Sequence, residues 1–211
     1  MAVSILGIYA LMVLASYLVG SFPTGYVVGR LHGIDVRHYG SGKTGGTNVL
    51  RTLGWGAMIA VVLADVIKGL IVAVLAQQFS GSPMVVVLCG LGVIGGHNWP
   101  VYIRFKGGSG VGTGLGVLIG IVPLVAAGLF LIFLIPVAVT RYMSLGSIAA
   151  AACAPIVLFS LFAAGQLPLE YALFGLVGAT LVLWRHRGNM SRLLAGTERK
   201  VGERVEVKRG D

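Results

Sequence analysis

Residues 84–140 read MVVVLCGLGVIGGHNWP, then VYIRFKGGSG, then VGTGLGVLIGIVPLVAAGLFLIFLIPVAVT. The first and last blocks carry no Lys, Arg, Asp or Glu, and the block between them holds two cations and three glycines. A helix needs about 20 apolar residues to cross the hydrocarbon core of a bilayer, with a working range of roughly 17–25. The stretch therefore predicts membrane-spanning helices with polar, glycine-rich turns between them.

Apolar segments of similar length occur on both sides of this stretch. The predicted spans are residues 3–20, 56–78, 84–100, 111–122, 124–140, 146–164 and 168–184. The fourth is short and ends at Pro123, so it is either a span through a thin region or a re-entrant segment. The first lacks the cationic flank and cleavage site of a secretory signal, and we interpret it as a retained span. The predicted fold class is an all-α integral membrane protein with about seven transmembrane helices.

The cations are distributed unevenly along the chain. Fifteen of the 16 Lys and Arg residues lie in residues 30–51, 104–106, 141 and 185–209. Under the positive-inside rule these segments face the cytoplasm, with the N-terminus outside and the C-terminus inside. We expect a single multi-span membrane domain over residues 1–200 and a solvated cytoplasmic tail over residues 201–211.

Composition excludes an ordinary soluble domain. Hydrophobic residues make up 56% of the chain and charged residues 11%, against about 25% charged residues in soluble domains. The net charge of +9 lies beside apolar spans, so attraction to anionic lipid headgroups explains it better than nucleic-acid binding. Asp65 and Lys68 interrupt the second span on one helix face. We interpret them as a structural ion pair near one end of the active cavity, with a proton or substrate relay as the alternative.

The first polar motif is GSFPTG at residues 20–25, followed by GIDVRHYGSGKTGGTNVLR at residues 33–51. A P-loop interpretation fails, because Arg37 stands where the first glycine is required and no strand precedes the loop. What remains is a loop whose backbone N–H groups, short polar side chains and cations suit a phosphate-sized anion. The candidate binding residues are Ser41, Gly42, Lys43, Gly45, Thr47, Asn48 and Arg51. A plain turn between spans is the alternative.

The second motif is GHNWP at residues 96–100, followed by RFKGGSGVGT at residues 104–113. This glycine-rich loop runs directly into the short fourth segment. An anion held there would gain from the unpaired N–H groups and the dipole at a helix N-terminus. The candidate residues are His97, Lys106, Gly107, Gly108, Ser109 and Thr113. Together with the first motif, they indicate a site that takes two anionic groups.

The third motif, WRHRGNMSRLLAGTE at residues 184–198, follows the last span. His186, Asn189 and Glu198 are candidates for orienting a substrate and handling protons, with a basic juxtamembrane anchor as the alternative. No nucleophile triad, metal-ligand spacing or pair of glycosidase acids is apparent, so we expect no metal and no cofactor. Such residues fit group transfer from an already activated donor.

The three motifs, in this order over residues 19–200, resemble those of the bacterial membrane acyltransferases of the PlsY type. These enzymes move a fatty acyl group from acyl phosphate to glycerol 3-phosphate. The resemblance implies seven spans in the bacterial inner membrane, an active site facing the cytoplasm, and the products lysophosphatidic acid and phosphate. It also implies membrane lipids as surroundings and no nucleic acid, and we expect a monomer.

The resemblance also suggests roles for the candidate residues. Ser41, His186 and Asn189 would act in catalysis. The acyl phosphate would be bound by Ser41, Gly42, Lys43, Gly45, Thr47, Asn48 and Arg51. The glycerol 3-phosphate would be bound by His97, Lys106, Gly107, Gly108, Ser109, Thr113, Arg187 and Glu198.

Two positions depart from the family pattern. Members usually have Asn in place of Lys43 and Lys in place of Ser109, so we hypothesise that one cation has been relocated within the cavity. The rival interpretation is a paralogue with altered activity, such as another lipid-headgroup enzyme. A small-anion transporter is a further alternative, although no inverted repeat is apparent and the polar motifs share one membrane face.

Overall fold

The computed structural model describes residues 4–207, and within them every regular element is a helix. The predicted all-α fold is therefore confirmed for this part of the chain. The longer helices are α1 (Ile5–Ser21), α4 (Trp55–Ser80), α5 (Pro83–Asn98), α6 (Val111–Ile121), α7 (Pro123–Thr140), α8 (Met143–Ala163) and α9 (Leu169–Arg185). The short ones are α2 (Thr24–Leu31), α3 (Gly46–Leu53), α10 (Arg187–Leu194) and the 3-10 turns η1 (Val36–His38) and η2 (Val101–Ile103).

Five helical segments are long and apolar enough to cross a membrane. They are Ile5–Leu31, Trp55–Ser80, Pro83–Ile103, Pro123–Thr140 and Met143–Ala163. The 11 residues of α6 extend about 16 Å along the helix axis, roughly half of a hydrocarbon core of about 30 Å. The short fourth segment of the sequence is thus a short helix, which continues into α7 through Val122.

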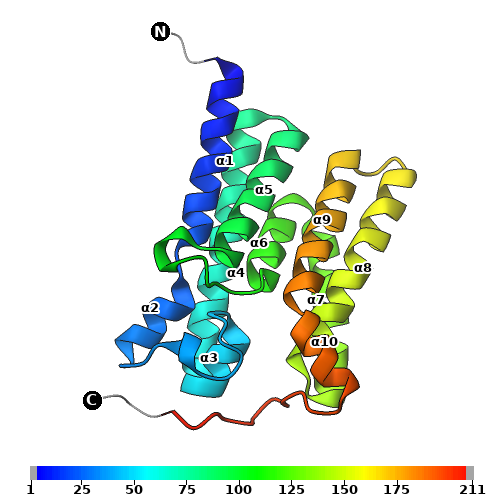
Figure 1. The fold of residues 1–211 in the computed structure, drawn as a ribbon. Coiled ribbons are helices and arrows are strands. Elements are labelled where there is room, and N and C mark those ends of the chain that lie inside the picture. Colours follow the sequence, from blue (N-terminus) through cyan, green and yellow to red (C-terminus); the bar gives the residue numbers. More distant parts are fainter. Residues whose placement is uncertain (1–3, 208–211) are drawn as a thin grey trace.

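The helices form a bundle in which α1, α4 and α5 lie on one side, α7, α8 and α9 on the other, and α6 between them (Figure 1). The main core is shared by the helices from α4 to α9 and includes Val117, Leu158 and Phe174. Chain ends lie at opposite ends of the bundle, and α2, α3 and α10 gather at the C-terminal end. This end therefore collects the short helices that carry the first and third sequence motifs.

Glycine permits the close packing of two helix pairs. A Cβ on Gly96 of α5 would lie 2.1 Å from the Tyr17 carbonyl oxygen of α1, and one on Gly116 of α6 would lie 2.0 Å from the Val66 carbonyl oxygen of α4. Neither position can carry a side chain without moving a helix. By contrast, a Cβ on Gly95 would meet nothing within 4 Å, so not every glycine of these spans has a packing role.

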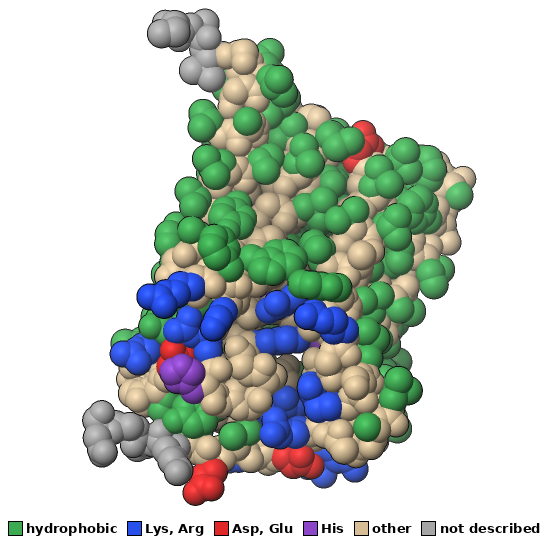
Figure 2. All heavy atoms as spheres, in the orientation of Figure 1, with side chains coloured by type: hydrophobic (Ala, Val, Ile, Leu, Met, Phe, Trp, Pro, Cys, Tyr) green, Lys and Arg blue, Asp and Glu red, His purple; other side chains and the backbone are tan. Residues whose placement is uncertain are grey.

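Charge is segregated along the bundle axis. Figure 2 shows hydrophobic side chains over the upper part of one face and most of the visible Lys and Arg side chains in its lower half. This arrangement agrees with the clustering of cations in the sequence. The lower half of the molecule, where the three motifs meet, is therefore the part whose positive charge suits the binding of an anion.

The residues after α10 cross this polar end of the bundle as an extended strap, which we define as residues 197–207. The Val201 N–H donates to the Arg141 carbonyl oxygen at 2.7 Å, and the Val205 N–H donates to that of Arg51 at 3.0 Å. Val207 packs on a small second core that contains Val36 and Val49. The charged residues of the strap beyond residue 202 are exposed, whereas its valines attach it to the bundle.

Candidate functional site

Two cavities adjoin at the polar end of the bundle. One, of about 430 Å³, has a polar end and a long apolar wall, and we name it the apolar-walled cavity. Its polar lining includes Ser41, Lys43, Thr47, Arg51, Asp65, His97, Ser109, Ser144, His186 and Asn189, and its wall includes Trp55, Met58, Leu63, Phe130, Phe133 and Val137. The other, of about 410 Å³, is lined by Ser41, Gly42, Lys43, Phe105, Lys106, Gly107, Arg185, Arg187, Gly188, Asn189 and Arg192. We name it the basic cavity, because it has five cations and no acidic side chain in its lining.

Ser41, Lys43 and Asn189 line both cavities. A molecule in the basic cavity and the head of a molecule in the apolar-walled cavity would therefore meet at these three side chains. One cavity suits a small polyanion and the other an amphiphile with a polar head and a hydrocarbon chain. The junction is thus a place where two such molecules could react.

Asn48 organises the first loop. Its Nδ2 donates to three backbone carbonyl oxygens, those of Val36, Tyr39 and Lys43, at 2.8, 3.1 and 2.9 Å. Its Oδ1 accepts from the Ser41 N–H at 2.9 Å. Because these contacts are all within the loop, the Asn48 amide holds the loop in shape and places Ser41 at the junction.

Lys43 extends from the first loop to the third motif. Its ammonium donates to the Arg185 carbonyl oxygen and lies 3.4 Å from the Asn189 Oδ1. Burial, aided by the positive charges of Arg185 and Arg192, lowers the pKa of Lys43 to about 8. The side chain is therefore a cation at neutral pH that loses its charge readily as the pH rises.

Glu198 connects the first and third motifs. Its carboxylate accepts from Arg51 at 3.2 Å, from Ser144 at 3.2 Å, from Asn189 at 3.0 Å and from Arg192 at 2.7 Å. Its side chain is only 1% exposed. Burial alone would raise the pKa of Glu198, but hydrogen bonds from Asn189 and Arg192 outweigh that effect and the pKa is lowered. The carboxylate is thus an anionic centre that orients the cations and amide around it.

Arg51 faces the apolar-walled cavity from α3. Its Nη2 donates to Glu198 and to the Arg199 carbonyl oxygen at 3.1 Å. The guanidinium carries five N–H donors in a fork, so the remaining ones can serve a ligand in the cavity that Arg51 lines. Glu198 therefore fixes one edge of the guanidinium and leaves the other edge for binding.

Arg185, at the end of α9, holds the second loop. Its Nε donates to the Gly108 carbonyl oxygen at 2.9 Å and its Nη2 to that of Gly107 at 3.0 Å. His97 lies against the same loop, because its carbonyl oxygen accepts from the Gly108 N–H at 3.0 Å. The second and third motifs, far apart in the sequence, thus form one structure.

Two helix N-termini open onto the apolar-walled cavity. Gly45, Gly46 and Thr47 at the start of α3 line it, and so do Val111 and Gly112 at the start of α6. The first N–H groups of a helix have no partner within the helix, and the dipole places partial positive charge there. Together they favour an anionic group at this end of the cavity.

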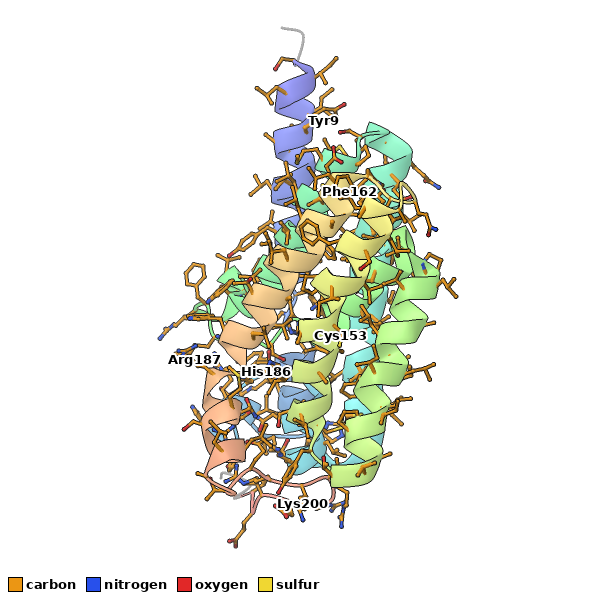
Figure 3. The ribbon with its side chains drawn as sticks, turned by 90° about the vertical axis from the view of Figure 1, so that its right-hand side faces the viewer. Tyr9, Cys153, Phe162, His186, Arg187 and Lys200 are labelled. Carbon is orange, nitrogen blue, oxygen red and sulfur yellow. The ribbon has the colours of Figure 1, made fainter. Side chains whose placement is uncertain are left out.

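His186 lies between α9 and α10 and is buried. In Figure 3 it points into the bundle, whereas Arg187 lies at its edge. Burial lowers the pKa of His186 to about 4, so the ring is neutral at pH 7. The Nδ1 lies 2.8 Å from the Val182 carbonyl oxygen, which only a protonated Nδ1 can satisfy. The Nε2 is then left as an acceptor.

The structure brings most of the predicted residues to the two cavities. Ser41, Lys43, Gly45, Thr47, Asn48, Arg51, His97, Ser109, His186 and Asn189 line the apolar-walled cavity, and Gly42, Lys106, Gly107 and Arg187 line the basic one. Gly108 lies against the His97 ring. Thr113 is fully buried where α6 meets Gly69 of α4, and Glu198 lies behind Arg51, so neither of these two lines a cavity.

Three residues of the site were absent from the sequence-based candidates. Arg185 and Arg192 lie in the third motif, and both line the basic cavity. Ser144, in the first turn of α8, donates to Glu198. The two arginines are cations in a predicted substrate motif, which is a usable signal. Ser144 lies in residues 140–145, a segment that resembles one of the family and that also holds the cation Arg141.

The fold and the site define a class, namely a multi-helix membrane protein in which a basic cavity adjoins a cavity with a polar end and an apolar wall. The family model described as Glycerol-3-phosphate acyltransferase matches residues 10–196, and the chain belongs to that family. A Gloeobacter violaceus protein named glycerol-3-phosphate acyltransferase is 48% identical over 203 residues, covering 94% of this chain and 95% of its own. The Moorella thermoacetica glycerol-3-phosphate acyltransferase 2 is 48% identical over 197 residues, covering 93% and 99%.

Solved structures agree with this assignment. The glycerol 3-phosphate form of PlsY (YgiH), an integral membrane glycerol 3-phosphate acyltransferase, aligns with a TM-score of 0.86 at 40% identity, covering 93% of this chain and 96% of that one. A second form of PlsY, with lysophosphatidic acid, gives a TM-score of 0.84 at 39% identity, covering 93% and 97%. The protein is thus an integral membrane protein with the PlsY fold.

Proposed function

We propose that this protein transfers a fatty acyl group from acyl phosphate to the 1-hydroxyl of glycerol 3-phosphate, giving lysophosphatidic acid and phosphate. One observation carries the proposal, namely that the basic and apolar-walled cavities meet at Ser41, Lys43 and Asn189. The forms of the related PlsY named for glycerol 3-phosphate and lysophosphatidic acid support the same acceptor and product.

The acyl phosphate occupies the apolar-walled cavity. Its chain lies along the wall formed by residues such as Phe130 and Phe133, and its phosphate lies near Arg51 and the N-terminus of α3. The hydroxyl of Ser41 is placed to donate to oxygen at the reacting acyl group. Such a donor, oriented before the reaction, stabilises charge that develops on the carbonyl oxygen by a few kcal/mol.

The glycerol 3-phosphate occupies the basic cavity, where Lys106, Arg187 and Arg192 offer charge to its phosphate. Ser109 and His97, which the sequence suggested for glycerol 3-phosphate, line the other cavity, and this supports a role for them on the donor side of the junction. Thr113 and Glu198 then act by packing and by orienting Arg51. Holding both reactants in place accounts for about 7–11 kcal/mol of barrier lowering at its most effective.

In the reaction, the 1-hydroxyl oxygen attacks the acyl carbon, the bond between that carbon and the phosphate oxygen breaks, and phosphate leaves with the electron pair. The hydroxyl proton passes to the departing phosphate. His186, with a pKa of about 4, is too weak a base to remove the proton at neutral pH. Before the attack, its Nε2 accepts a hydrogen bond from the hydroxyl and so orients it, and this bond is given up as the proton moves to the departing phosphate.

The activity assay uses purified protein in detergent with palmitoyl phosphate and glycerol 3-phosphate. We expect phosphate and lysophosphatidate in equal amounts, and no product with acyl-CoA as the donor. Headgroup chemistry without acyl transfer, or anion flux through liposomes without product, would contradict the proposal and favour the other two candidates.

Arg51 gives the sharpest variant for this assay. A charge-assisted hydrogen bond is worth about 1.5–3 kcal/mol, or roughly one to two decades in rate, so Arg51→Ala loses at least that much. Arg51→Lys does not recover it fully, because an ammonium lacks the planar fork. Arg30→Ala removes an exposed arginine of α2 and is the matched control. If a folded Arg51→Ala protein turned over at the wild-type rate, the first loop and Arg51 would not be part of the active site.

The topology belongs to the same proposal. We place seven helices in the bacterial inner membrane, with the short α6 crossing at a thin region, the N-terminus outside and both cavities open to the cytoplasm, and we expect a monomer. The opposite placement of the chain ends along the bundle supports an odd number of crossings. In a Cys89→Ala, Cys153→Ala background, Gln166→Cys should react with an impermeant maleimide in intact cells, and Lys200→Cys only after permeabilisation. The reverse pattern would refute this orientation.

A further inference from the structure

Three buried polar side chains, Asp65, Lys68 and His97, form a cluster at the apolar-walled cavity, which Asp65 and His97 line. The Lys68 Nζ lies 2.7 Å from the Asp65 Oδ1, as the sequence predicted for this pair. The same Nζ lies 3.0 Å from the His97 Nδ1. Thr24 donates to the Asp65 Oδ1 at 3.2 Å, and all three side chains of the cluster are less than a tenth exposed. None of the steps proposed above uses the cluster as a unit.

The contact between Lys68 and His97 determines where the ring proton lies. An ammonium can only donate, so a His97 Nδ1 at 3.0 Å from it must accept. The competing partner of this nitrogen, the Asp65 Oδ1, is farther away at 3.5 Å and already accepts from Lys68 and Thr24. The neutral ring therefore carries its proton on Nε2.

The Nε2 edge of His97 faces the second loop. A Cβ built on Gly108 would lie 2.0 Å from the Nε2, so a side chain at this position would have to displace the His97 ring. His97 and Ser109 line the apolar-walled cavity, together with the first residues of α6. Within the described residues the Nε2 makes none of the hydrogen bonds that hold the loop, so a ligand in the cavity that His97 lines can reach it only beside Gly108.

We propose that Lys68, held by Asp65, fixes His97 in the Nε2–H tautomer, so that His97 donates to an anionic oxygen of the acyl phosphate at the start of α6. This inference rests on the proposed function for the identity of the ligand. His97 is a binding residue in it, and Lys68 and Asp65 are positioning residues that act through the ring.

The arrangement makes the donor insensitive to pH. The charged groups around His97 are Asp65 and Lys68 on α4 and Arg185 of α9, whose guanidinium binds the loop carbonyls. While Lys68 remains charged, Nδ1 stays an acceptor and Nε2 stays protonated. Without the ammonium, the carboxylate of Asp65 would favour protonation of the ring at low pH. At high pH the single proton of the neutral ring would move to Nδ1. The Nε2 would then be an acceptor that faces an anion.

The tautomer can be read directly. Nitrogen-15 NMR spectra of the labelled protein in detergent should show a protonated Nε2 and an unprotonated Nδ1 for His97. The signals of His97 are assigned by their loss in the His97→Gln variant. This measurement needs no turnover, so it tests the tautomer even if the proposed reaction is wrong. A protonated Nδ1 in the wild-type protein would overturn the inference.

Variants test the consequence for binding. With a long-chain acyl phosphonate as the probe, Lys68→Met should weaken affinity about tenfold or more at about pH 8.5 and much less at about pH 6, where His97 can protonate. Lys68→Arg keeps a donor toward Nδ1 and should bind as the wild type does at both pH values. Thermal unfolding in detergent shows that each variant is folded.

The control background is His97→Gln, whose amide N–H occupies the position of the Nε2 donor whatever Lys68 does. Lys68→Met in this background should change affinity by less than about threefold at either pH. If Lys68→Met weakens binding equally in both backgrounds, or shows no new dependence on pH, Lys68 does not act through the His97 tautomer and the proposal fails.

Discussion

Glu198→Gln tests how much the polar end depends on one carboxylate. The change keeps the volume but places an NH₂ group against either Arg192 or the three donors at Oε1, and it leaves Arg51 buried without its counter-charge. Removing one partner of a buried ion pair costs about 3–5 kcal/mol, so we expect the free energy of unfolding to fall by that amount. Because Arg51 loses its counter-charge and one set of donors faces an NH₂ group, the positions of Arg51 and Asn189 are less well fixed, and kcat/KM should fall as well.

The measurement is unfolding in detergent by denaturant, run beside turnover of acyl phosphate at a temperature where the variant is folded. Glu203→Gln is the matched control, because it makes the same chemical change at an exposed position of the strap and should stay within about 0.5 kcal/mol of the wild type. A loss for Glu198→Gln of less than about 1 kcal/mol relative to this control would refute the assignment of Glu198 as the centre of the network.

The remaining predictions concern the loops, the strap and pH. Since the pKa of Lys43 is about 8 in the free protein, kcat/KM should decline as the pH rises past that value, and Lys43→Arg should remove the decline; an unchanged profile would show that the charge of Lys43 is not used. Lys43→Asn alone should impair turnover, whereas Lys43→Asn combined with Ser109→Lys should preserve or improve it, and equal activity in all three proteins would sink the idea of a relocated cation. Val205→Pro removes the N–H that binds the Arg51 carbonyl oxygen and should lower kcat/KM more than it lowers stability; normal kinetics would show that the strap does not position Arg51. The pKa of His186 is about 4 when folded and about 6.5 when unfolded, so the unfolded chain binds more protons between these values and stability should fall as the pH drops from about 6.5 to about 4. His186→Asn should lose this part of the pH dependence, as measured by unfolding at several pH values.

The long apolar helices could be predicted because each is determined by a local property, the length of an uncharged apolar run. The predicted span 146–164 differs from α8 by a few residues at its start, where a polar Ser144 hides the helix. The short helix α3 was missed because Gly45 and Gly46 open it and only eight residues form it. A helix this short forms because of its tertiary contacts and not because of the helix propensity of its own residues.

The sequence predicted which residue types form the candidate site better than it predicted which of them contact one another. Glycine, cations and short polar side chains identified the loops, since anion binding needs those groups at close spacing. The pairing of Arg51 with Glu198 joins residues 147 positions apart, and no local pattern reports such a contact. Thr113 shows the opposite error. It is a polar residue inside a predicted binding motif, but it is packed between two helices.

The strap has a consequence for biosynthesis. Residues 197–207 follow every membrane helix along the chain, yet they hold the Arg51 backbone and the turn at Arg141, which are made much earlier. A nascent chain can therefore insert all of its helices while the first loop still lacks its last support. The first loop would therefore reach its full set of contacts only after residues 197–207 have been made and have docked against Arg51 and Arg141.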